Sequence, residues 1–130
     1  DAPSRETCTT ERGVTNTPLQ AFILMNDPQY VEAARVFAES LLTSPGSDRE
    51  RLSTAFERVS SRSPNEGEME IITAALERER RQYRTDQPGA EKLLSVGESP
   101  RTRDLPAAEH AAWTNICGLL LNLSEAVTRR

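Results

Sequence analysis

The residues that could carry chemistry are few, and they do not form a known catalytic set. The single histidine, His110, stands three residues before Trp113 and seven before Cys117, so the three side chains lie near one face of a helix. Seven helical residues span about 10 Å along the axis, whereas zinc ligands lie within about 2.3 Å of the ion. His110 and Cys117 therefore cannot share a zinc ion on a regular helix. We interpret His110 as a packing or capping residue beside a core tryptophan and cysteine, and we predict no metal site.

Cys8 is the other candidate nucleophile. Its flanking charges are mixed, and nothing nearby in the sequence supplies the base or positive field that a reactive thiolate needs. Cys8 and Cys117 could form one disulfide, remain two free thiols, or pair with an absent partner, and the count leaves these alternatives open. The chain contains no Cys-x-x-Cys-His, so we predict no cofactor, haem included, in this domain.

Several carboxylates and arginines cluster between residues 66 and 84, a pattern that could suggest acid–base work or a phosphate site. Glu77, however, precedes Arg80 and Arg81 by three and four residues, the spacing of an exposed, ion-paired helix surface. We assign Glu66 to a helix cap and interpret the remaining members in the same way as Glu77, as a solvated face: Glu68, Glu70, Glu79, Arg78 and Arg84. No phosphate loop, nucleophile elbow or zinc-protease motif is present. We therefore predict no catalytic residue and no enzyme complete within this chain.

Composition excludes two classes of partner. The formal net charge of the 130 residues is -4, which argues against a primary role on nucleic acid because phosphate binding requires clustered positive charge. The longest apolar run, Ala21 to Met25, is far shorter than the roughly 20 residues that span a bilayer, so we expect no membrane span in this chain. The chain opens on Asp1 without an initiator Met, and we expect it to be a processed product or a piece of a larger protein, with any targeting signal upstream.

Helix-start signals recur along the chain and predict the elements. Thr17-Pro18-Leu19-Gln20 is a capping box with proline at the first helical position, and Asp27-Pro28 repeats the signal ten residues later. Further boxes begin at Ser47 and Ser63. The first predicted helix covers residues 18–25, the second begins at Pro28 and is ended by residues 44–46, and the third is opened by the Ser47 box with an apolar stripe as far as Val59. The others cover residues 64–85 and 90–96, with a last helix from about residue 106.

The predicted breaks separate these helices. Residues 86–89 should stop the fourth helix, Gly97 should close the fifth, and residues 97–104 read as a polar loop. In the helix that begins at Pro28 we assign Glu32, Arg35 and Glu39 to the polar side. No segment alternates with period two, so we expect no sheet. The prediction is an extended lead-in over residues 1–16 and one all-α domain over 17–130, a compact orthogonal bundle of about five to six helices.

The sequence also resembles a known family. The resemblance is carried by Ser4-Arg5-Glu6-Thr7-Cys8, Thr15 to Ala21, Leu24-Met25-Asn26-Asp27-Pro28 and Glu32-Ala33-Ala34-Arg35, and continues in Val96-Gly97-Glu98-Ser99-Pro100 and Ala112-Trp113. These blocks resemble the C-terminal domain of a planctomycete family of unknown function, whose members are large exported proteins associated with cytochrome c domains.

The resemblance implies that the chain is the C-terminal fragment of a larger, periplasmic or otherwise exported protein, in which any haem belongs to an upstream domain. It assigns no catalytic residue. Cys8 falls where the family often has cysteine, whereas Cys117 departs from the pattern, which argues against a shared disulfide.

We weigh two functions. The first is a non-catalytic docking module that binds the upstream domains of its own parent chain or another protein, with a docking surface at Asn16, Gln20, Asn26, Asp27 and Gln29. The second is a contribution of polar residues to a composite active or ligand site, possibly carbohydrate-related, that upstream domains complete. Helix caps would consume these side chains, whereas a concave pocket would expose them, so the use of their polar atoms separates the two.

Overall fold

The computed structural model describes residues 27–128, and in the last helix it describes side chains as far as Ser124. Within that range the chain forms five helices and no strand, which confirms the prediction of an all-α fold. The helices are α3 (Pro28–Leu42), α4 (Asp48–Ser60), α5 (Glu66–Arg84), α6 (Gln87–Leu94) and α7 (Ala107–Thr128). The lead-in over 1–16 and the predicted helix over 18–25 lie outside the described residues.

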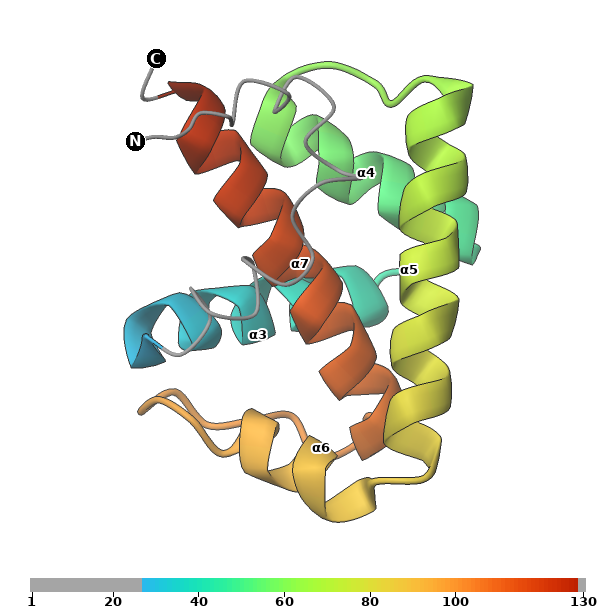
Figure 1. Cartoon of the computed structure of the whole chain (residues 1–130). Coiled ribbons are helices and arrows are strands. Elements are labelled where there is room, and N and C mark those ends of the chain that lie inside the picture. Colours follow the sequence, from blue (N-terminus) through green and yellow to red (C-terminus); the bar gives the residue numbers. More distant parts are fainter. Residues whose placement is uncertain (1–26, 129–130) are drawn as a thin grey trace, which may run out of the picture.

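Helix α7 is the centre of the bundle. It packs against all four of the other described helices, most extensively α3, and Figure 1 shows it crossing the molecule diagonally between α3 and α5. Such a position explains why its middle section is apolar around most of its circumference, since a helix with neighbours on several sides has no wide polar face. Every residue from Ala111 to Leu120 is buried.

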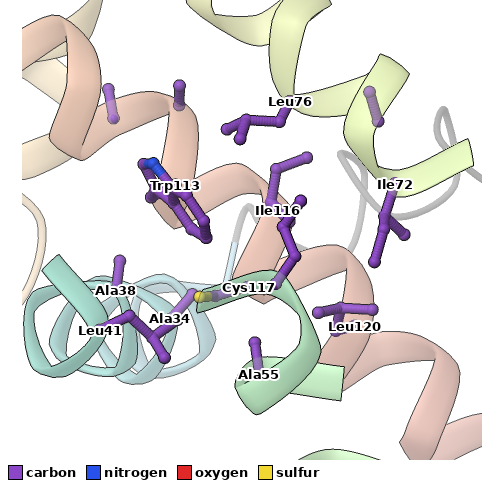
Figure 2. Close-up of a cluster of buried hydrophobic side chains, with 14 of the residues drawn as sticks. Ala34, Ala38, Leu41, Ala55, Ile72, Leu76, Trp113, Ile116, Cys117 and Leu120 are labelled. Carbon is purple, nitrogen blue, oxygen red and sulfur yellow. The ribbon is translucent and has the colours of Figure 1, made fainter. Parts of the chain in front are cut away.

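The core is built where α7 meets α3, α4 and α5. Trp113, Ile116, Cys117 and Leu120 project from α7 toward small residues of α3 and larger aliphatic residues of α5 (Figure 2). Ala34 and Ala38 are fully buried and let α3 approach α7 closely. Cys117 is a buried free thiol, and burial raises its pKa, so it packs as a small apolar side chain.

Capping interactions set the helix starts. The Asp27 side chain accepts a hydrogen bond from the Gln29 amide at 2.9 Å, with Pro28 in the first turn, as predicted. Ser47 and Glu50 form the predicted capping box. The predicted box at Ser63 is wrong, because Asn65 caps α5 in a reciprocal pair with Glu68 and Pro64 precedes the cap.

Residues 86–89 follow the end of α5 at Arg84, as predicted, but their helical role was not predicted. They begin α6 rather than only ending α5, because the Asp86 side chain accepts from the Gly89 amide at 3.0 Å and Pro88 occupies the first turn. A Cβ at Gly89 would lie 2.3 Å from Asp86 Oδ2, so a larger residue at this position would force the capping carboxylate to move. The helix predicted over 90–96 therefore starts three residues earlier and ends at Leu94. The last helix begins after Pro106, as predicted.

None of the helices in the described range combines the length and the hydropathy that crossing a bilayer would require.

Candidate functional site

One network of polar contacts joins α3 to residues 95–106, the connection we call the α6–α7 loop. Glu32 of α3 makes the first contact, since its Oε2 accepts from the Ser99 amide at 2.6 Å. Hydrogen bonds from the side chain and backbone of Ser99, and from the backbone of Glu98, hold the Glu32 pKa below its ordinary value. Gly97 adopts a φ of +94° and approaches so closely that an added Cβ would lie 2.6 Å from Glu32 Cδ. The loop backbone can reach α3 only because this residue is glycine.

Arg35 makes the second contact, one turn further along α3. Its side chain is fully buried, with Nη2 donating to the Ser99 carbonyl at 2.7 Å and Nη1 donating to Glu39 Oε2 at 3.2 Å. Glu39 makes the third contact by accepting from the Thr102 amide at 3.0 Å and the Thr102 hydroxyl at 3.2 Å. Three side chains of α3 thus bind the α6–α7 loop mainly through its backbone, and we call this set the loop clamp: Glu32, Arg35 and Glu39.

His110 of α7 lies beneath the loop clamp and is fully buried. Its Nε2 is 3.3 Å from the Arg35 carbonyl oxygen and 3.8 Å from Glu39 Oε2, while its Nδ1 has no partner among the described residues. Burial lowers the His110 pKa below its ordinary 6.5, so the ring is neutral at pH 7. No set of three potential metal-ligating side chains gathers anywhere between residues 27 and 128. A ring sealed from solvent in this way can position α3 against α7, but it cannot exchange protons readily with a substrate.

The side of the loop that faces away from α3 is exposed to solvent, whereas the loop backbone is hydrogen-bonded to α3. Gly97, Glu98, Ser99 and Pro100 are all solvent-accessible. Arg101 turns back and donates to Glu91 of α6 at 2.6 Å, which fixes the far side of the loop. The arrangement presents a short polar segment in one defined conformation, beside the turn of α3 that carries Glu32, which follows the exposed Gln29 and the N-cap Asp27.

A second polar cluster centres on Arg80 of α5. Its guanidinium donates to Asp48 of α4 at 2.7 and 2.9 Å, to Glu77 at 2.9 Å and to both oxygens of Glu109 of α7. The bonds to Asp48 and Glu109 raise the Arg80 pKa, and the bond from Arg80 lowers the Asp48 pKa. Glu109 also accepts from Trp113 Nε1 at 3.0 Å. The cluster joins three helices, so its role is structural.

A third polar cluster, formed by Glu79, Tyr83 and Asn115, is buried between α5 and α7, so the prediction that Glu79 lies on a solvated face is wrong. Asn115 Nδ2 donates to Glu79 Oε1 and to the Tyr83 hydroxyl, each at 2.9 Å. Burial raises the pKa of Glu79, and burial likewise raises that of Tyr83. The carboxylate therefore costs free energy when it is ionised in the folded state.

We predict that Glu79→Gln stabilises the fold at pH 7 by up to about 1 kcal/mol, because glutamine keeps the acceptor for Asn115 without a buried charge. A raised folded-state pKa means that ionisation costs stability above that pKa, so the advantage should vanish as the pH falls below the ordinary 4.5. Urea unfolding of both chains at pH 7 and near pH 4 checks this. Glu70→Gln, at an exposed position, is the control and should leave the unfolding free energy unchanged at both pH values. A clear loss of stability in Glu79→Gln at pH 7 would refute the claim that the buried charge of Glu79 destabilises the fold.

Comparison of the sequence with models of protein families identifies the family of this chain. The model for PSD1, described as a protein of unknown function (DUF1553), matches residues 1–76. The chain belongs to the PSD1 family. The match covers α3, α4 and the first part of α5, and so includes all three side chains of the loop clamp, whereas the loop itself lies beyond it. No curated protein and no solved structure matches the chain.

The predicted docking residues are only partly described in this member of the PSD1 family. Asn16, Gln20 and Asn26 lie outside the described residues, as does Cys8. Asp27 uses its carboxylate to cap α3, and Gln29 is exposed on the first turn. Among the chemical candidates, His110 and Cys117 are both buried core residues, as interpreted from the sequence. Glu77 does pair with Arg80, and Arg81 has no carboxylate within ion-pair distance between residues 27 and 128.

The loop clamp was not found from the sequence, and one assignment within it was wrong. Arg35 was placed on the polar side of its helix, yet it is completely buried. A signal was present, because Arg35 stands four residues after Val31 and three before Ala38, both of which lie in the core. The partner that compensates the buried charge comes from a loop more than sixty residues away, and helix periodicity does not reveal it.

Proposed function

We propose that this PSD1 domain is a non-catalytic docking module, and that it binds through the exposed side of the α6–α7 loop together with the adjoining first turns of α3. We call this combination the docking surface and define it by Asp27, Gln29, Glu98, Ser99 and Pro100. The partner is either the upstream part of its own parent chain or another protein. Asn16, Gln20 and Asn26 extend the proposal into residues outside the described range.

The observation that carries the proposal is the binding of the loop backbone by Glu32, Arg35 and Glu39. A partner that meets a loop already held in one conformation loses little conformational entropy on binding, and preorganisation of this kind raises affinity. The contacts from α3 go to backbone atoms of Ser99 and Thr102 and to their hydroxyls, so Glu98 and Pro100 are the exposed loop side chains that stay available for recognition.

The polar groups that could carry chemistry are occupied by contacts within the fold, which favours docking over a composite active or ligand site. Asp27 spends its carboxylate on a helix cap, and His110, Glu79 and Arg35 are buried between packed helices. A group that takes part in ligand chemistry must reach the ligand, whereas these groups hold helices and loop together.

We further propose that the parent is a large exported planctomycete protein that carries cytochrome c domains upstream. The support is the sequence resemblance described above together with the PSD1 match. In that arrangement any haem resides outside this domain, and the periplasm or cell exterior is the place of action.

Calorimetric titration of this chain into the separately expressed remainder of the parent tests the proposal. We expect micromolar or tighter binding, and about a tenfold loss of affinity in the double variant Gln29→Ala/Glu98→Ala, since both side chains are exposed and central to the docking surface. Thr73→Ala, exposed on α5, is the matched control and should bind like the unmodified chain.

The unfolding free energy of the double variant should stay within about 0.5 kcal/mol of the original, because neither side chain is buried. Equal affinity of the double variant and the control would refute the docking surface. A polysaccharide panel is titrated in parallel, and binding to a glycan without binding to the parent would refute the docking function itself.

A further inference from the structure

Three exposed arginines form a stripe along the C-terminal half of α5: Arg78, Arg81 and Arg84. They stand three residues apart, so they follow one another along the outside of the helix over about 9 Å, away from the inward-facing Ile72, Leu76 and Tyr83. Figure 1 shows α5 along one side of the bundle, with α3 and the α6–α7 loop toward the opposite side. The stripe is therefore separate from the docking surface.

These three arginines differ from most others in residues 27–128 because none of them makes an ion pair or hydrogen bond within that range. The other described arginines have partners, with the exception of Arg103: Arg35, Arg49, Arg51, Arg58, Arg62, Arg80 and Arg101. Glu77 stands four residues before Arg81, but its carboxylate binds Arg80. Arg78 is near enough to Glu79 to lower that residue's pKa, yet it makes no ion pair with it.

Stability of the helix does not account for the stripe. Cations in the last turn of a helix interact favourably with the helix dipole. This effect explains Arg81 and Arg84, which lie in the last turn of α5, but it does not explain Arg78. Like charges three residues apart on a helix repel one another, so Arg78 opposes Arg81 and Arg81 opposes Arg84. An arrangement that is unfavourable within the chain becomes favourable when negative charge approaches from outside.

The surroundings of the stripe define the size of that negative partner. Exposed Glu70 lies about two turns before Arg78, and exposed Asp86 follows Arg84 by two residues. The positive patch is thus bounded by acidic residues on both sides, on a chain whose net charge is -4. A long polyanion would meet repulsion beyond the patch, whereas a short row of carboxylates would not.

We propose that the stripe of Arg78, Arg81 and Arg84 is a second interaction surface, and that its partner is a short, carboxylate-rich segment of a protein. Planar guanidinium groups bind carboxylates in a two-point geometry, and three of them in a row match two or three acidic side chains on one partner element. The surface does not depend on the docking function of the α6–α7 loop.

Amide chemical shifts of the ¹⁵N-labelled chain, titrated with an octaglutamate peptide, test this proposal. We expect saturable shifts concentrated in residues 78–85, weakened by added salt because the contacts are between exposed charges. The variant Arg78→Gln/Arg81→Gln/Arg84→Gln should bind the peptide about tenfold more weakly. Arg49→Gln/Lys92→Gln/Arg103→Gln removes the same number of exposed positive charges elsewhere and should retain the binding.

Three outcomes would overturn the proposal. One is an equal loss of binding in the two triple variants, which would show a general charge effect. Another is a set of shifts spread over basic residues throughout the molecule. The last is tighter binding of a long polyphosphate than of octaglutamate at the same stripe, which would point to a phosphate polymer. Circular dichroism of each variant verifies that α5 is intact, and Arg78→Gln alone, outside the last turn, provides a second test if the triple variant unfolds.

Discussion

Replacing Arg35 by alanine should lower the free energy of unfolding by about 3 kcal/mol. The guanidinium is fully buried, fills space between α3 and the α6–α7 loop, and donates to both Glu39 and the Ser99 carbonyl. Its removal leaves a cavity, an unpaired carbonyl and a carboxylate that has lost its cation, and costs of this kind are of the order of 3 to 5 kcal/mol for a buried pair. Urea unfolding followed by circular dichroism measures the change.

A double-mutant cycle with Glu39 separates the loss of charge pairing from the loss of packing. Arg35→Met keeps much of the side-chain volume, and Arg35→Met/Glu39→Gln also removes the stranded carboxylate. We expect the double variant to be more stable than the sum of the single effects predicts, because Arg35 and Glu39 are in direct contact. Strict additivity, or a loss below about 1 kcal/mol for Arg35→Ala, would show that the clamp contributes little.

Replacing Arg80 by alanine should lower the free energy of unfolding by about 2 to 3 kcal/mol. This loss is somewhat smaller than the loss expected for Arg35→Ala, because the three carboxylates around Arg80 retain partial contact with water. The loss leaves Asp48, Glu77 and Glu109 close together without a cation, and like charges then repel one another. The Asp48 pKa is lowered by Arg80, so the contribution of this pair is present above the ordinary pKa of 3.8 and disappears as the pH falls. The difference between the variant and the original chain should therefore shrink in acid.

The pH dependence of urea unfolding measures this effect, and Arg80→Lys provides the comparison. Lysine keeps the charge but cannot donate to three carboxylates in the fork geometry of arginine, so an intermediate loss is expected. Arg81→Ala, on the exposed side of the same helix, is the control and should stay within about 0.5 kcal/mol. A loss in Arg80→Ala that does not change with pH would indicate packing rather than charge pairing.

The sequence predicts the helices because the signals for them are local. Asp27, Ser47 and the apolar spacing of α3 and α7 each act within a few residues, and the structure confirms them. The errors arose where two local signals competed. Ser63 and Asn65 both precede a possible first turn, and Asn65 is the cap because Glu68 stands at the correct distance to complete the box.

The loop clamp could not be predicted in the same way. Glu32, Arg35 and Glu39 are ordinary residues of an amphipathic helix until the chain returns at Ser99 and Thr102 to accept and donate their hydrogen bonds. That contact is tertiary and leaves only one trace in the sequence, an arginine among positions that are otherwise apolar. The Arg80 cluster is similar, since its local pair with Glu77 was expected while its partners Asp48 and Glu109 come from other helices.

Amide hydrogen exchange at Ser99 and Thr102 is the most direct test of the central claim, that α3 holds the α6–α7 loop in one conformation. Both amides donate to α3 carboxylates, Ser99 to Glu32 and Thr102 to Glu39. We predict that both exchange far more slowly than in an unstructured peptide, and that Arg35→Met accelerates them more than it accelerates the amides of α5. Exchange of both amides at the unstructured rate in the unmodified chain would contradict the account.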